Sequence, residues 1–154
     1  MRSPAGSSVR ALEPRDTEAV LSIQAASPEI AQWSLWDYDR VTRGEMAGWA
    51  AEVDGEVAGF LVARRIGPDL EILNLAVRPG ERRRGIGGSL LEAAISWAKS
   101  YNAEKAMLEV RASNIAALRF YERHSFEIAG RRPRYYTAPV EDALLLTATL
   151  KSNQ

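Results

Sequence analysis

Apolar and polar residues follow regular spacings along most of the chain, and each spacing indicates an element. Between residues 85 and 101 the apolar positions recur every three or four residues, the stripe of an amphipathic helix. Residues 48–53 and 56–66 are apolar-rich runs joined by Asp54-Gly55, which supplies the positive φ of a tight hairpin turn. The pattern therefore predicts a hairpin followed by a long helix in the middle of the chain.

The flanking segments predict further strands and helices. A second turn at residues 67–69 leads into another strand, so three antiparallel strands follow one another. Strands are expected over residues 9–12, 48–53, 56–66, 71–77, 105–110, 126–129 and 143–150, and helices after a cap at Asp16 or Thr17 and over 37–45, 85–101 and 114–123. This order is typical of an α+β domain around one α/β-type mixed sheet. We expect the domain over residues 9–150, with a flexible leader (1–8) and a tail (151–154).

Composition narrows the classes of function. The chain has 154 residues, with 20 Lys and Arg against 20 Asp and Glu, so it has no bulk attraction to nucleic acid. The lack of Cys excludes disulfides and thiolate chemistry, and a single His, His124, excludes a zinc site built from several His. No apolar run approaches the ~20 residues of a membrane span. We expect a cytoplasmic domain with no metal, no membrane contact and no direct nucleic-acid role.

The most specific local feature is Arg82-Arg83-Arg84-Gly85-Ile86-Gly87-Gly88, between a predicted strand and the long helix. The first amides of a helix lack partners within it and carry partial positive charge. Glycines let a bulky anion approach the backbone, and arginines add charge-assisted hydrogen bonds to phosphate. The segment lacks the Lys-Ser/Thr of a Walker loop and the Gly-x-Gly-x-x-Gly of a dinucleotide site. It predicts a phosphate-binding loop; a tight helix start beside solvated arginines is the alternative.

This loop resembles the acetyl-CoA pyrophosphate loop, Arg/Gln-x-x-Gly-x-Gly/Ala, of the GCN5-related N-acetyltransferase (GNAT) superfamily. The preceding segment, residues 74–79, is similar to the family's strand and turn. Residues 108–122 and 131–143 resemble the RimI-type branch, which acetylates the N-terminal alanine of a small-subunit ribosomal protein. The resemblance covers residues 74–150 well and the upstream part less well, where Gln32 stands in place of a family Pro. It implies a GNAT fold, with a central, mostly antiparallel, splayed sheet flanked by helices.

The resemblance also implies a reaction in which acetyl-CoA donates its acetyl group to a protein N-terminus by direct attack of the amine. Such a transfer needs one group to remove the amine proton and another to protonate the leaving sulfur. Glu109 lies among apolar residues of a strand, and a carboxylate partly withdrawn from water is a better base. The family assigns the first role to Glu109 and the second to Tyr121. A surface Glu paired with Arg111 or Lys105, and a half-buried core aromatic, are the competing interpretations.

Other residues are expected to hold the two substrates. The backbone of a splayed strand could pair with the pantetheine arm of the cofactor, and Asn114, otherwise a helix cap, could bond the same arm. The residues expected to bind acetyl-CoA are Leu75, Ala76, Val77, Arg82, Arg83, Arg84, Gly85, Ile86, Gly87, Gly88 and Asn114. Those expected to line an acceptor groove are Trp33, Tyr135 and Tyr136, the last two in a basic segment that could equally be a solvated hairpin loop.

Two other functions stay open. The chain could be a GNAT enzyme that acetylates a Lys side chain or a small-molecule amine, which differs in the acceptor groove. It could also be a noncatalytic acyl-CoA-binding or scaffold module, although such a module needs neither Glu109 nor Tyr121. One departure from the family concerns stability: Ser125 replaces a Gly at a helix end, where a left-handed conformation costs about 1 kcal/mol.

Overall fold

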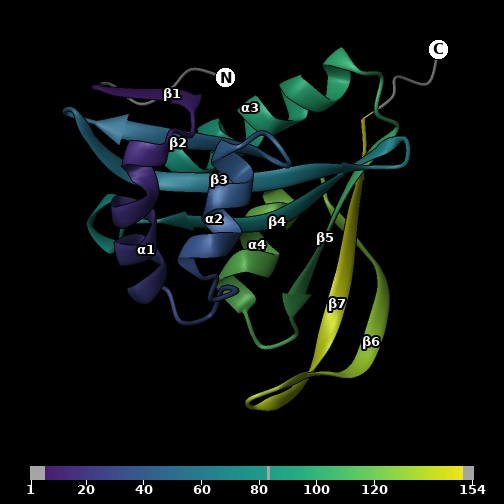
Figure 1. The fold of residues 1–154 in the computed structure, drawn as a ribbon. Coiled ribbons are helices and arrows are strands. Elements are labelled where there is room, and N and C mark those ends of the chain that lie inside the picture. Colours follow the sequence, from purple (N-terminus) through teal and green to yellow (C-terminus); the bar gives the residue numbers. More distant parts are fainter. Residues whose placement is uncertain (1–5, 83, 151–154) are drawn as a thin grey trace.

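The computed structural model describes residues 6–82 and 84–150. Within them seven strands form one sheet in the order β1-β2-β3-β4-β5-β7-β6 (Figure 1). The elements in chain order are β1 (Ser7–Ala11), η1 (Pro14–Asp16), α1 (Thr17–Ala25), α2 (Leu35–Thr42), β2 (Ala47–Val53), β3 (Glu56–Ile66), β4 (Asp69–Val77), η2 (Pro79–Glu81), α3 (Ile86–Ser100), β5 (Lys105–Arg111), α4 (Ile115–Arg123), β6 (Glu127–Thr137) and β7 (Val140–Thr149). Adjacent strands are antiparallel except β4 and β5, which are parallel. The expected mixed, mostly antiparallel sheet is confirmed.

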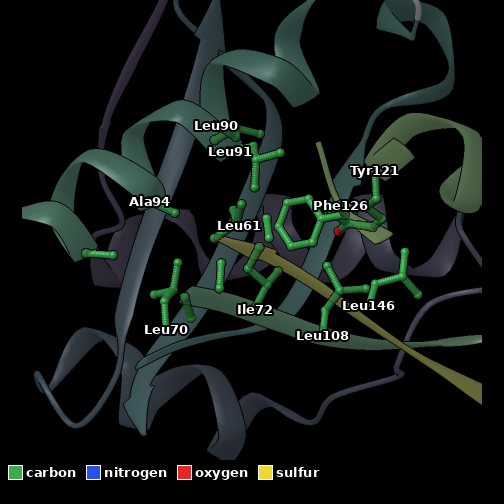
Figure 2. Close-up of a cluster of buried hydrophobic side chains, with 14 of the residues drawn as sticks. Leu61, Leu70, Ile72, Leu90, Leu91, Ala94, Leu108, Tyr121, Phe126 and Leu146 are labelled. Carbon is green, nitrogen blue, oxygen red and sulfur yellow. The ribbon is translucent and has the colours of Figure 1, made fainter. Parts of the chain in front are cut away.

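Two apolar cores lie on opposite faces of this sheet. The stripe of α3 packs with α4 against β2–β5 and β7; Figure 2 shows its central side chains, among them Leu61, Ile72, Leu90, Leu108 and Leu146. On the other face, α1 and α2 bury a smaller core against β2, β3 and β4. That second core includes no residue of the described β5, β6 or β7. The helices therefore leave this half of the sheet face open (Figure 1).

A β-bulge in β4 divides the sheet at its centre. Val62 of β3 pairs with Asn74 and Ala63 pairs with Ile72, so Leu73 is an extra residue. Ile72 belongs to the α3 core, whereas Leu73 packs against the α1–α2 core and Asn74 bonds to α2. Bulges bend a strand and increase its twist. The parallel β4–β5 ladder holds only two pairs, Leu70 with Ala106 and Glu71 with Met107, and it stops just before this bulge.

Several boundaries differ from those predicted. The segment of residues 131–136 is part of β6 and not a loop, because β6 and β7 are longer than expected. As the edge strand, β6 tolerates Pro133, which lacks an amide donor. At the other end, β1 begins at Ser7, inside the segment expected to be a leader. Residues 1–5 and 151–154, and thus most of the expected leader and tail, lie outside the described residues.

The helix starts were predicted more closely than their caps. Asp16 precedes α1 as expected, but its carboxylate accepts hydrogen bonds from the Glu13 amide (2.8 Å) and the Arg10 guanidinium (2.7 and 2.8 Å) instead of capping α1. Burial opposes ionisation of this carboxyl, yet these hydrogen bonds outweigh burial and lower the pKa of Asp16. The short helix expected over 37–45 is α2, which begins two residues earlier at Leu35.

Ser125 ends α4 in the left-handed conformation expected of a Gly, with φ of 71°. The Ser125 amide donates to Glu122 (3.1 Å) and the Phe126 amide to Tyr121 (3.0 Å), the hydrogen-bond pair of a Schellman motif. Ser125→Gly should remove the steric penalty of the Cβ and stabilise the protein by roughly 1 kcal/mol, seen as a melting temperature about 2–4 °C higher. An unchanged or lower melting temperature would show that Ser stabilises this turn, relative to Gly, by an equal or larger amount.

Candidate active site

The centre of the candidate site is the gap that opens where β4 and β5 part. Leu75, Ala76 and Val77 lie beyond the last β4–β5 pair and still pair with β3 on their other side. Backbone groups of β4 that point toward β5 at this level have no strand partner there. The splay expected from the resemblance is thus confirmed, and it presents a strand edge to which an amide-rich chain can add.

The glycine-rich loop forms the start of α3 at one end of this gap. Gly85 is the N-cap residue and has φ of 81°, a left-handed conformation that favours glycine. The helical hydrogen bonds begin at the Ser89 amide, which donates to the Gly85 carbonyl (3.0 Å). The amides of Ile86, Gly87 and Gly88 precede this bond and lie at the positive end of the helix dipole. A Cβ on Gly87 would stand 3.2 Å from the Phe120 ring, so this glycine lets α3 approach α4 closely.

The arginines of the loop brace it rather than extend toward a ligand. Arg82 donates to the Val77 carbonyl (3.1 Å) and to the Ser27 hydroxyl (2.9 Å). Arg84 donates to Glu81 at 2.5 Å. Arg83, also expected to bind phosphate, lies outside the described residues. In this arrangement the two arginines hold the loop in place, and the backbone amides at the start of α3 are further candidate donors to a phosphate. Phosphate binding by Arg82 and Arg84 themselves stays a prediction.

Glu109 lies on β5, two residues past the last pair with β4, and its side chain is on the open face of the sheet. Alternate residues of β5, such as Leu108, are buried in the α3 core. The Glu109 side chain is 19% exposed, and its Oε2 stands 2.9 Å from the Nε of Arg132. Of the two alternative partners, Arg111 pairs with Glu141 instead (3.2 Å), and no ion pair joins Glu109 to Lys105 among the described residues. The carboxylate is therefore at the mouth of the gap, largely withdrawn from solvent.

Tyr121 lies on α4, across the sheet from Glu109. Its ring is buried in the α3 core next to Phe126 (Figure 2). The ring centroids of Phe120 and Phe126 lie 5.1 and 5.3 Å from that of Tyr121. Its hydroxyl makes no hydrogen bond to any of the described residues, and burial raises the pKa of the phenol well above 10, so it is protonated at neutral pH. Glu109 and Tyr121 thus flank the β4–β5 gap from opposite faces of the sheet.

Asn114 caps α4, as expected for one of its two predicted roles. Its Oδ1 accepts a hydrogen bond from the Ala117 amide at 3.2 Å. Its Nδ2 donates to none of the described residues. Capping therefore leaves the amide donor of Asn114 available to a ligand, and the two roles are compatible.

The basic and aromatic residues of β6 form a wall beside Glu109. The rings of Tyr135 and Tyr136 lie 5.1 Å apart, and the Arg111 guanidinium stacks 4.3 Å from the Tyr136 ring. Burial, followed by the negative charge of Glu109, raises the pKa of Tyr136. Tyr135 and Tyr136 are therefore on a strand next to the carboxylate, and not in the solvated loop that was the alternative.

The opposite wall is the loop between α1 and α2, held by a buried network that the sequence did not reveal. Gln24 exchanges two hydrogen bonds with the backbone of Trp33 (2.8 and 2.9 Å) and accepts one from Tyr38 (2.5 Å). Asn74 donates to Tyr38 (3.2 Å) and to the Ala31 carbonyl (3.0 Å). The only sequence signal was a lone Asn in an apolar strand. The network ties the Trp33 loop to β4 beside the gap.

Gln32, which departs from the family's Pro, acts locally in this loop. Its side-chain amide donates to the carbonyls of Gln24, Ser27 and Ile30 (3.1–3.3 Å). Hydrogen bonds of the Gln32 side chain therefore order the loop at the position where the family has a Pro. Across residues 6–82 and 84–150, no three His, Asp or Glu side chains converge as a metal site, and no helix there is long and apolar enough to cross a membrane.

Comparisons with known proteins agree with this geometry. The model of the acetyltransferase (GNAT) family matches residues 9–126. An N-alpha-acetyltransferase of Sulfurisphaera tokodaii is 39% identical over 149 residues, covering 88% of each chain. A ribosomal protein bS18-alanine N-acetyltransferase of Escherichia coli K12 is 36% identical over 95 residues, covering 60% of this chain and 64% of the relative. The crystal structure of the ribosomal-protein-S18-alanine N-acetyltransferase from Escherichia coli superposes with a TM-score of 0.84 at 27% identity, covering 96% of both chains.

Proposed function

Because this chain belongs to the GNAT family of acetyltransferases, we propose that it transfers the acetyl group of acetyl-CoA to the N-terminal amine of a protein. The observation that carries the proposal is the β4–β5 gap flanked by Glu109 on one face and Tyr121 on the other. A binding module would need the gap but neither of these two side chains. The chain has no Cys, which suits direct attack by the amine without a thioester on the enzyme.

The residues around the gap fit acetyl-CoA. The amides of residues 86–88 would hold its pyrophosphate at the start of α3. The free edge of β4 at residues 75–77 would pair with the pantetheine amides, and Asn114 would add a donor through Nδ2. When bound, acetyl-CoA supplies the acetyl group as an activated thioester. The gap would then place the thioester between the two faces of the sheet.

Glu109 and Tyr121 would move the two protons of the reaction. The Glu109 carboxylate, at the mouth of the gap, accepts the proton that the amine loses, directly or through a water molecule. The Tyr121 phenol, which is protonated at neutral pH and whose pKa burial raises further, gives a proton to the sulfur that leaves. An N-terminal amine has a pKa near 8, against about 10.4 for Lys. A larger share of it is therefore already neutral at pH 7, and the base has less to do.

The acceptor would lie on the open face of β5–β7, between the Trp33 loop and the wall of Tyr135 and Tyr136. An alanine-first acceptor, in particular a small-subunit ribosomal protein, is supported by the relatives named as acting on the alanine of bS18. The archaeal relative named simply as an N-alpha-acetyltransferase supports the N-terminal amine but not the alanine. The choice of amine and the choice of first residue are therefore tested separately.

The test offers acetyl-CoA and three short peptides to the full chain and locates the acetyl group by mass spectrometry. One peptide begins with free Ala-Arg and contains no Lys; a second begins with Ser and is otherwise identical; the third has a blocked N-terminus and one internal Lys. We expect acetylation of the Ala-first peptide, slower acetylation of the Ser-first peptide and none of the third. Transfer to Lys alone would contradict the N-terminal acceptor and leave acetyl transfer intact. Binding of acetyl-CoA with no transfer to any amine would favour the noncatalytic module.

A further inference from the structure

The only ion pair that Glu109 makes with the described residues lacks a hydrogen bond. Its Oε2 is buried, yet no donor among the described residues is aligned with it as a hydrogen bond. The Arg132 Nε stands 2.9 Å away, close enough for charge pairing without the alignment of a hydrogen bond. A buried carboxylate oxygen in this state has unused capacity for a donor.

Arg132 reaches this carboxylate from the far side of β7. It pairs with Ala143 on β7, while Glu109 pairs with Leu145 two residues away on the same strand face. The guanidinium is held loosely: the Arg132 side chain is 59% exposed, and its Cζ lies 5.4 Å from the centroid of the Tyr135 ring. If it left Glu109, it could remain in solvent or over that aromatic face.

The neighbouring charges are already satisfied by other partners. Arg111 pairs with Glu141, and Arg131 pairs with Asp142. Among the described residues Arg132 is thus the one cation paired with Glu109, and its departure without replacement would leave a carboxylate that is only 19% exposed without a counter-charge, which is unfavourable. The ammonium of an incoming N-terminus carries the same charge and presents its own donors.

We propose that Arg132 is a positioning residue whose guanidinium neutralises Glu109 in the free enzyme and is exchanged for the cationic amine of the acceptor. This inference rests on the proposed function, because it requires an amine to arrive at Glu109. The exchange keeps the carboxylate paired throughout and makes Arg132 a competitor of the acceptor for one buried oxygen. It thereby weakens binding of every cationic acceptor by a fixed factor, without touching the chemical step.

The test measures peptide binding by calorimetry in the presence of CoA without the acetyl group, so that no transfer occurs. The probes are the free-amine Ala-first peptide and the same peptide already acetylated, which is neutral at its N-terminus. Arg132→Gln should tighten binding of the free-amine peptide about fivefold, as expected for loss of a half-exposed competing ion pair, and change binding of the acetylated peptide less than twofold. In turnover, KM for the peptide should fall by a similar factor with kcat within about twofold.

Two further variants separate this exchange from a structural effect. Arg131→Gln lies on the same strand and pairs with Asp142 instead, so neither peptide should bind differently. Arg132→Lys restores the cation and should return the affinity toward that of the wild type. Equal tightening of both peptides, or weaker binding of the free-amine peptide, overturns the exchange while leaving the proposed function standing. A wild-type chain that binds neither peptide contradicts the N-terminal acceptor and the exchange together.

Discussion

Glu109→Gln should lower kcat/KM for an Ala-first peptide about 10³-fold at pH 7, within the usual contribution of a general base. Gln has the same shape and stays within reach of the same neighbours, but its amide accepts no proton. The substitution removes a largely buried charge, and the released Arg132 is already mostly exposed. We therefore expect the melting temperature to stay within a few degrees of the wild type, so that the loss reports on chemistry.

The pH dependence of this loss identifies the proton that Glu109 moves. The acceptor amine has a pKa near 8, so above that value it reaches the enzyme already neutral and needs a base less. The deficit of Glu109→Gln should shrink by about tenfold or more between pH 7 and pH 9.5, followed by the rate of peptide acetylation. Glu127→Gln, on the exposed edge strand β6, serves as the matched control and should leave the rate unchanged. Activity of Glu109→Gln within threefold of the wild type at pH 7 would show that another group, or water alone, takes the proton.

The elements that sequence patterning predicted well are those whose signals are local. The hairpin at Asp54-Gly55 and the amphipathic stripe of α3 are each written within one stretch of chain, and their boundaries agree to within about one residue. The prediction for residues 131–136 was wrong because this segment carries no such local signal. As the edge strand, β6 is exposed along most of its length, so it lacks the alternation that a half-buried strand imposes. Its pairing with β7 across a short hairpin turn, which no pattern within residues 131–136 marks, makes it a strand.

The features of the candidate site likewise fall into those that local sequence predicts and those that it does not. Gly85 at the N-cap of α3 and Asn114 at the N-cap of α4 follow from local rules and were anticipated. The partners of the charged side chains were not, because each joins residues distant in the chain: Arg82 bonds Ser27, and Arg132 pairs with Glu109. The opening between β4 and β5 begins beside a bulge at Leu73 that no local pattern marks. The types of side chain at the site could thus be predicted from local sequence, whereas their partners and relative positions depend on tertiary pairing.

Tyr121→Phe should lower kcat about 10²-fold, at the lower end of what a general acid contributes, with KM for acetyl-CoA changed less than threefold. The phenol loses only its hydroxyl, and the ring keeps its contacts with Phe120 and Phe126. Because that hydroxyl makes no hydrogen bond to any described residue, its removal breaks none of their contacts and should leave the melting temperature within about 2 °C of the wild type. Steady-state kinetics and thermal unfolding of the same preparation measure both quantities.

Tyr101→Phe serves as the control, because it should lower stability and leave activity unchanged. The Tyr101 hydroxyl donates to the Asp69 carbonyl at 3.2 Å, at the end of the sheet away from the gap. Its removal should cost about 1 kcal/mol of stability and leave kcat unchanged. A tyrosine that served only as a core aromatic would behave at position 121 as a ring alone, and Tyr121→Phe would then keep full activity. Loss of activity with stability retained at Tyr121, against loss of stability with activity retained at Tyr101, would show that the Tyr121 hydroxyl, and not its ring alone, serves the reaction.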